Sequence, residues 1–209
     1  MARYTDAVCK KCRREGIKLF LKGTRCNTNK CAIDRRAYAP GQHGKGRSKL
    51  SEYGLQLRAK QRTKTYYRVS ESQFRKYYDE AFRRVGITSD MMFEQLELRL
   101  DNIAYRMGVG TSRAEARQLV GYGMIEVNGK KSNIPSQILR PGDVVKVRDV
   151  KKDNKTIVSV MEVNKLKAAP AWLEVDKDEM SAKVLRKPVR EDVDLDVQES
   201  LIVELYSKA

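Results

Sequence analysis

The sequence predicts an α+β protein: a mainly helical domain and a small module of two helices plus an antiparallel sheet, preceded by an extended N-terminal arm pinned by a metal ion. Three observations predict this fold. Four cysteines lie within the first 31 residues, apolar side chains recur at helical spacing between residues 51 and 120, and short strands with tight turns follow between residues 125 and 147.

The composition is strongly basic. The chain has 209 residues, with 43 Lys and Arg against 27 Asp and Glu, a net charge of +16 and a pI near 9.7. This excess argues against an ordinary metabolic enzyme of neutral or acidic character. The apolar runs are too short for a membrane span, and charges interrupt the N-terminus where a signal peptide needs an apolar core, so we expect a cytoplasmic protein without a membrane partner.

The positive charge is concentrated near the N-terminus. Residues 1–50 hold 14 basic and 3 acidic side chains, whereas residues 151–209 hold 11 and 12. A general need for solubility would not concentrate charge in this way. The first quarter of the chain therefore resembles an anion-binding arm, although a merely solvated basic tail is the simpler alternative.

The cysteine spacing is typical of a structural metal site. Two close pairs, C-x2-C and C-x4-C, are separated by thirteen residues, so four thiolates can converge tetrahedrally and leave no open coordination position. Zinc is the preferred occupant of such a site, and an iron–sulfur cluster is the alternative because it uses the same thiolates. The predicted ligands are Cys9, Cys12, Cys26 and Cys31.

We expect the segment 35–49 to form an extended strap that becomes ordered when it binds RNA. Its Gly and Pro residues prevent a helix, while its basic and aromatic side chains suit phosphates and exposed bases. His43 is the only histidine, and no partner for catalysis is evident beside it.

Three helices are expected after the strap. The first spans 51–68 and carries four cations at exposed positions; the second begins at the capping box Ser70-x-x-Gln73 and ends at Gly86; the third runs from about 89 to 107. The apolar side chains of the second helix, from Phe74 to Val85, follow the 3.6-residue period and predict a core-facing surface.

The next expected helix is one that Ser112 caps. Arg113 and Arg117 lie four residues apart, so we expect them to share one exposed face beside the free N–H groups of that helix, an arrangement suited to phosphate. Strands are expected at 125–127 and 144–147, with a tight turn at 128–129. Residues 158–163 fit either a strand or a helix, and the aspartates between 192 and 196 predict a solvated acidic turn rather than a cation site.

Several motifs closely resemble the family of the fourth protein of the small ribosomal subunit. They are Arg99-Leu100-Asp101-Asn102, Tyr105-Arg106-Met107-Gly108, Ser112-Arg113, Ala116 to Val120, Gly123, Ile125 and Val127-Asn128-Gly129, together with the strap Pro40 to Gly44, Trp172-Leu173 and the tail Leu201 to Ser207. The resemblance covers essentially the whole chain. It departs at Tyr122 and Met124, where the family often has histidines.

The resemblance implies a domain plan and a non-enzymatic role. The plan is an arm and strap over 1-45, a helical domain over 46-98 completed by 161-209, and an inserted RNA-binding module over 99-160. The implied role is that of a ribosome-bound primary binder of small-subunit ribosomal RNA, at a multi-helix junction of the five-prime domain, that nucleates assembly of the subunit body. The resemblance also implies contact with the fifth small-subunit protein and other neighbours in the particle, an influence on decoding accuracy, and in some bacteria repression of the protein's own messenger RNA.

The residues and the resemblance together predict the RNA contacts. The set comprises Arg3, Lys10, Lys11, Arg13, Arg14, Lys22, Arg35, Arg36, Tyr38, Gln42, His43, Lys45, Arg47 and Lys49 of the arm and strap, Arg58, Lys60, Arg62, Lys64 and Arg68 of the helical domain, and Arg106, Ser112, Arg113, Arg117, Gln118, Asn128, Lys130 and Lys131 of the module.

Two other classes of protein fit part of the pattern. An RNA-modifying enzyme can carry a similar module, but the sequence offers no phosphate-binding Gly loop and no convergent nucleophile and base. A zinc-dependent DNA-binding regulator fits the cysteines, but no helix has a major-groove recognition pattern.

Overall fold

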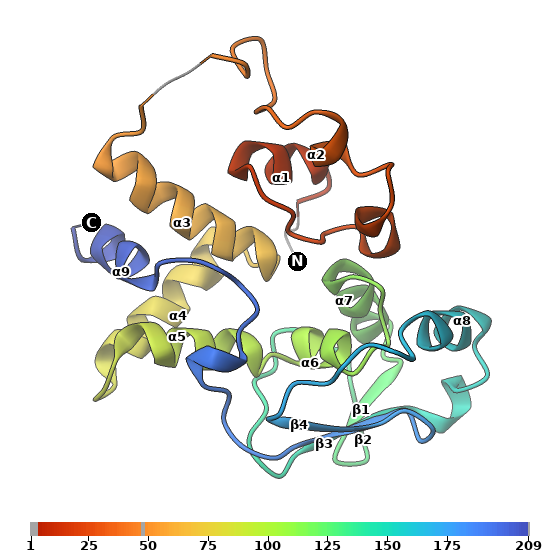
Figure 1. The fold of residues 1–209 in the computed structure, drawn as a ribbon. Coiled ribbons are helices and arrows are strands. Elements are labelled where there is room, and N and C mark those ends of the chain that lie inside the picture. Colours follow the sequence, from red (N-terminus) through yellow and green to blue (C-terminus); the bar gives the residue numbers. More distant parts are fainter. Residues whose placement is uncertain (1–3, 47–48, 209) are drawn as a thin grey trace. The chain divides into compact units, whose positions relative to one another are not determined.

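The computed structural model describes residues 4–46 and 49–208 (Figure 1). Its contacts divide the chain into two units. Unit 1 comprises the chain up to Met92 together with the chain from Leu195, and unit 2 is Phe93–Asp194.

Unit 1 consists of helices and loops. Its arm contains α1, the 3-10 helix η1 and α2, and its helical part contains α3, α4 and α9, while α5 begins in unit 1 and ends in unit 2. The bounds are Cys9–Glu15 for α1, Gly23–Asn27 for η1, Ala32–Arg35 for α2, Glu52–Tyr66 for α3, Glu71–Arg83 for α4, Thr88–Glu97 for α5 and Glu199–Ser207 for α9.

Serine side chains begin the two long helices of unit 1, as the sequence predicts. The Ser51 hydroxyl accepts a hydrogen bond from the Gly54 N–H at 3.2 Å, and the Ser70 hydroxyl accepts one from the Gln73 N–H at 3.4 Å. Each bond satisfies one of the backbone donors that a helix start leaves free. The starts of α3 and α4 are therefore set locally.

An aromatic cluster joins α4 to the C-terminal helix α9. The Tyr206 ring lies 4.8 Å from the Tyr78 ring and 6.1 Å from the Phe74 ring, measured between centroids. The core-facing surface of α4 is shorter than predicted, because Phe82 near its end is 65% exposed, while Val85 lies beyond the last helical residue, Arg83, and is 98% exposed. The apolar pattern of the sequence therefore continues beyond the buried part of the helix.

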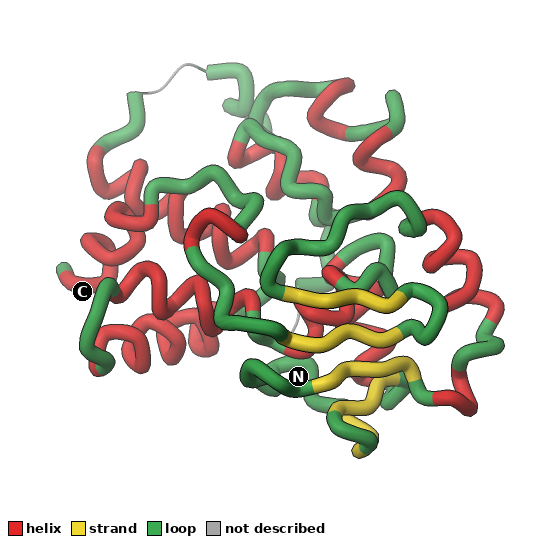
Figure 2. Tube along the Cα trace, turned by 60° about the horizontal axis from the view of Figure 1, so that its bottom comes forward, coloured by secondary structure: helices red, strands yellow, loops and turns green. Residues whose placement is uncertain are grey.

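Unit 2 combines helices with one antiparallel sheet. The strand order is β2-β1-β3-β5-β4, and every neighbouring pair is antiparallel (Figure 2). The elements are α6 Leu100–Arg106, α7 Arg113–Gly121, β1 Ile125–Val127, β2 Lys130–Ser132, β3 Val144–Val147, η2 Asp149–Lys151, α8 Lys155–Val163, β4 Leu173–Asp176, β5 Ser181–Val184 and η3 Arg190–Asp192.

The sheet is larger than the sequence predicts. β5 pairs with β3 through Val145 and Ala182, and β4 pairs with β5, so residues 173–184 extend the sheet of the module. Residues up to Asp194 therefore cluster with unit 2, whereas the expected plan assigned 161-209 to the helical domain.

Two local predictions need correction or completion. The expected helix over 89–107 is two helices, α5 and α6, because Arg99 adopts an extended backbone and bridges to Ile138. The ambiguous segment at 158–163 is helical and belongs to α8, which the Asn154 side chain caps by accepting from the Thr156 N–H at 2.9 Å.

The core of unit 2 lies between its helices and its sheet. Trp172, Ile103, Ile125 and Val145 are fully buried in it, and Met124 packs against it. Within residues 4–46 and 49–208, none of the helices combines the length and apolar character that crossing a membrane requires.

Candidate nucleic-acid interface

The four arm cysteines are free thiols. Cys12, Cys26 and Cys31 are buried, and Cys9 is half-buried. Burial raises the pKa of the Cys12 thiol, a backbone hydrogen bond from Leu19 opposes this, and the negative charges of the other three thiolates raise the pKa further. The thiols therefore lie near enough to influence one another.

One of these sulfurs also accepts a backbone hydrogen bond. The Lys22 N–H donates to the Cys26 sulfur at 3.4 Å, in the manner of the hydrogen bonds that commonly surround metal-bound thiolates. Nevertheless, among residues 4–46 and 49–208 no three His, Cys, Asp or Glu side chains are grouped closely enough to hold a metal ion. The predicted zinc or iron–sulfur site stays a prediction.

Arg13 fastens the strap to α1. Its Nε donates to the Tyr38 carbonyl at 3.0 Å and its guanidinium to the Ala39 carbonyl at 3.4 Å. The Tyr38 ring also lies 5.0 Å from the Arg13 guanidinium and 5.2 Å from the Lys45 ammonium. Arg13 therefore shapes the strap, a role that the sequence alone does not reveal.

Apart from Arg35, the last residue of α2, the described residues of the strap form no helix or strand, as predicted, but they turn tightly at glycines where an extended course was expected. The Gly44 N–H donates to the Gly41 carbonyl, and the Gly46 N–H to the His43 carbonyl. A Cβ atom on Gly44 would lie 1.8 Å from the Ala39 carbonyl oxygen, so the turn requires glycine there. His43 is exposed at this turn.

Most predicted RNA contacts of the arm are accessible. Lys11 and Arg13 are half-buried, while Arg3 and Arg47 lie outside the described residues. The exposed members are Lys10, Arg14, Lys22, Arg35, Arg36, Tyr38, Gln42, His43, Lys45 and Lys49.

The cations of α3 are less exposed than predicted. Lys60 is 9% exposed, and Arg58, Arg62, Lys64 and the adjacent Arg68 are half-buried. The reason is that this face of α3 packs within unit 1 and forms ion pairs there. The sequence predicted an exposed cationic surface here, whereas these side chains are partly buried.

Glu71 compensates two of the α3 cations. Its carboxylate accepts from Lys60 at 2.8 Å, from Lys64 at 2.7 Å and from the Tyr206 hydroxyl at 2.8 Å. Burial by itself raises the pKa of Glu71, but these three hydrogen bonds outweigh it and lower the pKa to about 2. Glu71 thus stays ionised, and much of the charge of Lys60 and Lys64 is used inside unit 1.

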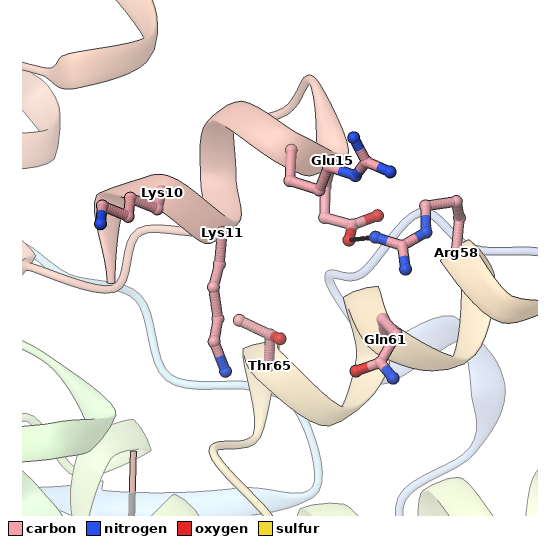
Figure 3. Close-up of a pocket in the computed structure, with 7 residues that line it drawn as sticks. Lys10, Lys11, Glu15, Arg58, Gln61 and Thr65 are labelled. Carbon is pink, nitrogen blue, oxygen red and sulfur yellow. Dashed lines mark hydrogen bonds and ion pairs between the residues drawn. The ribbon is translucent and has the colours of Figure 1, made fainter. Parts of the chain in front are cut away.

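A small pocket lies between α1 and α3. Its volume is about 200 Å³, and its lining is almost entirely polar or charged. Figure 3 shows the Lys11 side chain reaching down toward Thr65 and the Glu15 carboxylate facing Arg58. Glu15, Gln61 and Thr65 were not predicted as site residues, since nothing in the sequence spacing brings α1 to α3.

Three of the predicted contacts in the module are buried. Arg106 is 7%, Ser112 7% and Arg113 8% exposed. The Ser112 hydroxyl accepts from the Glu115 N–H at 3.4 Å, which confirms it as the cap of α7.

Buried polar groups hold these arginines inside unit 2. Arg106 donates to both carboxylate oxygens of Glu97, at 3.2 and 3.1 Å, and also pairs with Asp194. Arg113 donates to the Asn102 side-chain oxygen at 2.9 Å, and its guanidinium lies over the Tyr105 ring. The arrangement gives both arginines an architectural role, and their contact with RNA stays a prediction.

Asp101 links two further arginines. Arg99, which is 1% exposed, donates to the two Asp101 oxygens at 3.0 and 2.8 Å, and Arg117 pairs with the same carboxylate. Arg117 is half-buried, so its charge is shared with Asp101. The predicted pairing of Arg113 with Arg117 on one exposed helix face is therefore wrong.

The hairpin of β1 and β2 carries two exposed cations of the module that were predicted to contact RNA. Lys130 and Lys131 are exposed on β2, and Asn128 at the turn is exposed while its side chain bonds Asp143 and the Val144 N–H. Gln118 is exposed and donates to the Tyr122 hydroxyl at 2.6 Å. These residues are available to a polyanion.

Comparison with known proteins identifies the family. A family model described as "Ribosomal protein S4/S9 N-terminal domain" matches residues 3–97, and one described as "S4 domain" matches residues 98–145. A small ribosomal subunit protein uS4 from Pelotomaculum thermopropionicum is 56% identical over 208 residues, and one from Ruminiclostridium cellulolyticum is 55% identical, each alignment covering 100% of both chains. A uS4A protein from Alkaliphilus oremlandii is 56% identical with the same coverage. The chain therefore belongs to the ribosomal protein S4 (uS4) family.

Proposed function

We propose that this protein is a structural, non-enzymatic constituent of the small ribosomal subunit that binds ribosomal RNA. The observation that carries the proposal is full-length similarity to small ribosomal subunit proteins, joined to an accessible cationic arm. Ribosome-bound protein is expected in the bacterial cytoplasm.

Recognition is expected to depend on RNA shape and phosphate pattern. The deep, narrow major groove of double-helical RNA hides its base edges from side chains, whereas its phosphates are accessible. The exposed cations of the arm and of the β2 hairpin, such as Lys10, Arg14, Lys130 and Lys131, suit such backbone contacts. The buried arginines of unit 2 would support this surface from within.

The finer assignment is to a junction in the five-prime domain of small-subunit RNA, where the protein would nucleate assembly of the subunit body. Contact with the fifth small-subunit protein, an effect on translational accuracy and repression of its own messenger RNA belong to the same proposal. Family resemblance supports them, and the accessible cationic surface is compatible with each.

We also propose that Cys9, Cys12, Cys26 and Cys31 hold one structural zinc ion. The type and number of donors suit zinc: there are four thiols, three of them are buried, and the Lys22 N–H donates to the Cys26 sulfur. When bound, the metal would crosslink the arm and contribute folding energy that so polar a segment lacks. An iron–sulfur cluster on the same thiolates is the alternative.

A competition assay tests the RNA assignment. The full chain is bound to the transcribed five-prime domain of small-subunit ribosomal RNA and challenged with duplex DNA of equal length. We expect RNA to compete far better than DNA. Equal competition by DNA would favour the alternative of a zinc-dependent DNA-binding regulator. Turnover of the RNA without a stable complex would favour the alternative of an RNA-modifying enzyme.

Metal analysis of anaerobically purified protein tests the zinc assignment. One zinc per chain is the expected result. Iron together with acid-labile sulfide would show that the thiolates hold an iron–sulfur cluster instead of zinc. A folded protein with neither zinc nor an iron–sulfur cluster would overturn the proposed metal site.

A further inference from the structure

The pocket between α1 and α3 is built from both helices. Lys11 and Glu15 come from α1, and Arg58 and Thr65 come from α3 (Figure 3). The full lining is Lys10, Lys11, Arg14, Glu15, Arg58, Gln61 and Thr65. All of these residues belong to unit 1.

The residues that line the pocket and its volume indicate the charge and size of the ligand that it can bind. The lining carries four cationic side chains and one carboxylate, which leaves three positive charges uncompensated within it. A volume of about 200 Å³ is below the usual range of about 300–1,000 Å³ for pockets that enclose drug-sized organic ligands. A small anion with several acceptor oxygens fits both conditions.

One ion pair connects the two walls of the pocket. Arg58 donates to Glu15 Oε1 at 3.0 Å, and the Glu15 side chain is only 4% exposed, against 24% for Arg58. The second carboxylate oxygen, Oε2, is buried and accepts no hydrogen bond from the part of the chain that the structure describes. A buried carboxylate in a cationic pocket weakens the attraction of the pocket for anions. The presence of Glu15 there therefore indicates a structural role, which is to fix Arg58 against α1.

We propose that this pocket binds one phosphodiester group of the RNA, with Lys11, Arg14 and Arg58 as the cationic partners and Glu15 as a positioning residue that orients Arg58. The inference rests on the proposed RNA-binding function and deepens it. Lys11 and Arg14 supply charge from the arm, and Arg58 supplies it from the helical part. The bound phosphate thereby joins the arm to α3.

A matched pair of double variants tests the pocket in the full chain. Lys11→Gln with Arg14→Gln removes two pocket cations, and Lys76→Gln with Arg83→Gln removes two exposed cations of α4 that lie outside the pocket. We expect the pocket variant to lose about tenfold or more in affinity for the transcribed five-prime domain, and to reduce the salt slope by about 0.7–0.9 for the lost phosphate. The α4 variant should lose less than about threefold.

Two substitutions at Glu15 separate a built pocket from a diffuse basic patch. In a diffuse patch Glu15→Ala removes a negative charge and must tighten RNA binding. In the proposed pocket it releases Arg58 and weakens binding, about fivefold, while Glu15→Gln keeps an acceptor for Arg58 and restores binding to within about twofold of the parent protein. Circular dichroism at each step verifies that helix content is unchanged.

The outcomes also separate this inference from the proposed function. If the parent protein fails to bind the RNA, the proposed function fails. If it binds, but both double variants lose equal affinity or Glu15→Ala tightens binding, only the pocket inference is overturned. Inorganic phosphate serves as the free-anion probe: phosphate that binds the parent protein through Lys11 and Arg14 but does not displace the RNA would assign the pocket to free anions instead.

Discussion

The substitution Glu97→Gln tests whether the buried ion pairs of unit 2 carry its stability. Glu97 is fully buried and accepts two hydrogen bonds from Arg106, at 3.2 and 3.1 Å, and one from Asn102 at 2.7 Å. Glutamine preserves the shape and removes the charge. Arg106 keeps its pair with Asp194, whose side chain is 64% exposed and therefore compensates it less well.

The expected loss is about 3 kcal/mol in the free energy of unfolding. Removing one partner of a buried ion pair typically costs about 3–5 kcal/mol, because the other charge is left uncompensated. Glutamine retains an acceptor for Arg106, which places the effect at the lower end. The double variant Glu97→Gln with Arg106→Met should recover about 2 kcal/mol of this loss, because no uncompensated cation remains.

Trp172 reports the unfolding of unit 2 directly. It is the only tryptophan of the chain and is fully buried in the core of that unit. Urea titrations of the full chain, followed by tryptophan fluorescence, therefore give the free energy for unit 2. Glu94→Gln is the matched control: it lies on the same helix, changes the same charge and breaks a more exposed pair with Lys187, so its loss should stay below about 1 kcal/mol.

A loss below about 1 kcal/mol for Glu97→Gln would refute this account of the network. So would a loss no larger than that of Glu94→Gln. Either result would mean that the arginines are held by packing and that their charges are free for RNA, as the sequence alone predicted for Arg106.

Three further predictions follow from the described contacts. Glu71→Gln should cost about 1 kcal/mol at pH 7 after allowance for solvent screening of a side chain that is 45% exposed. Because the folded protein lowers the pKa of Glu71 from 4.5 to about 2, the difference in unfolding free energy between parent and variant should disappear as the pH falls through this window. Gly44→Ala should open the strap, since its Cβ would clash with the Ala39 carbonyl, and limited proteolysis should cleave the variant severalfold faster than the parent. Cys9→Ser should raise amide hydrogen exchange across the arm and leave the protection of 99–150 unchanged; lost protection in that segment would mean that the arm and the module do not fold separately.

Local signals in the sequence predicted many of the elements correctly. The serine caps at Ser51, Ser70 and Ser112 depend on side chains within three residues of the backbone they bond, so the sequence alone reveals them. The hairpin after β1 is equally local, because Asn128 and Gly129 both adopt the positive φ that its turn requires.

Long-range contacts decided what the sequence could not predict. An arginine that binds phosphate and an arginine that binds a buried carboxylate look alike in sequence, and only the fold brings Glu97 to Arg106 and Asp101 to Arg117. The α1–α3 pocket has the same origin, since Glu15 and Arg58 are 43 residues apart.

The net charge of +16 therefore has two uses. Cations such as Lys60 and Arg106 are satisfied inside the units, where their partners hold helices and strands together. Those of the arm and of the β2 hairpin, such as Lys10, Arg14 and Lys130, are exposed. These exposed cations are available to hold RNA.

The salt dependence of RNA binding tests the central claim most directly. If the full chain engages about ten phosphates, log affinity for the transcribed five-prime domain should fall with log salt at a slope between about −7 and −9. This is the predicted result for an extended cationic surface. A slope near about −2 would mean only two or three phosphate contacts and would contradict the account.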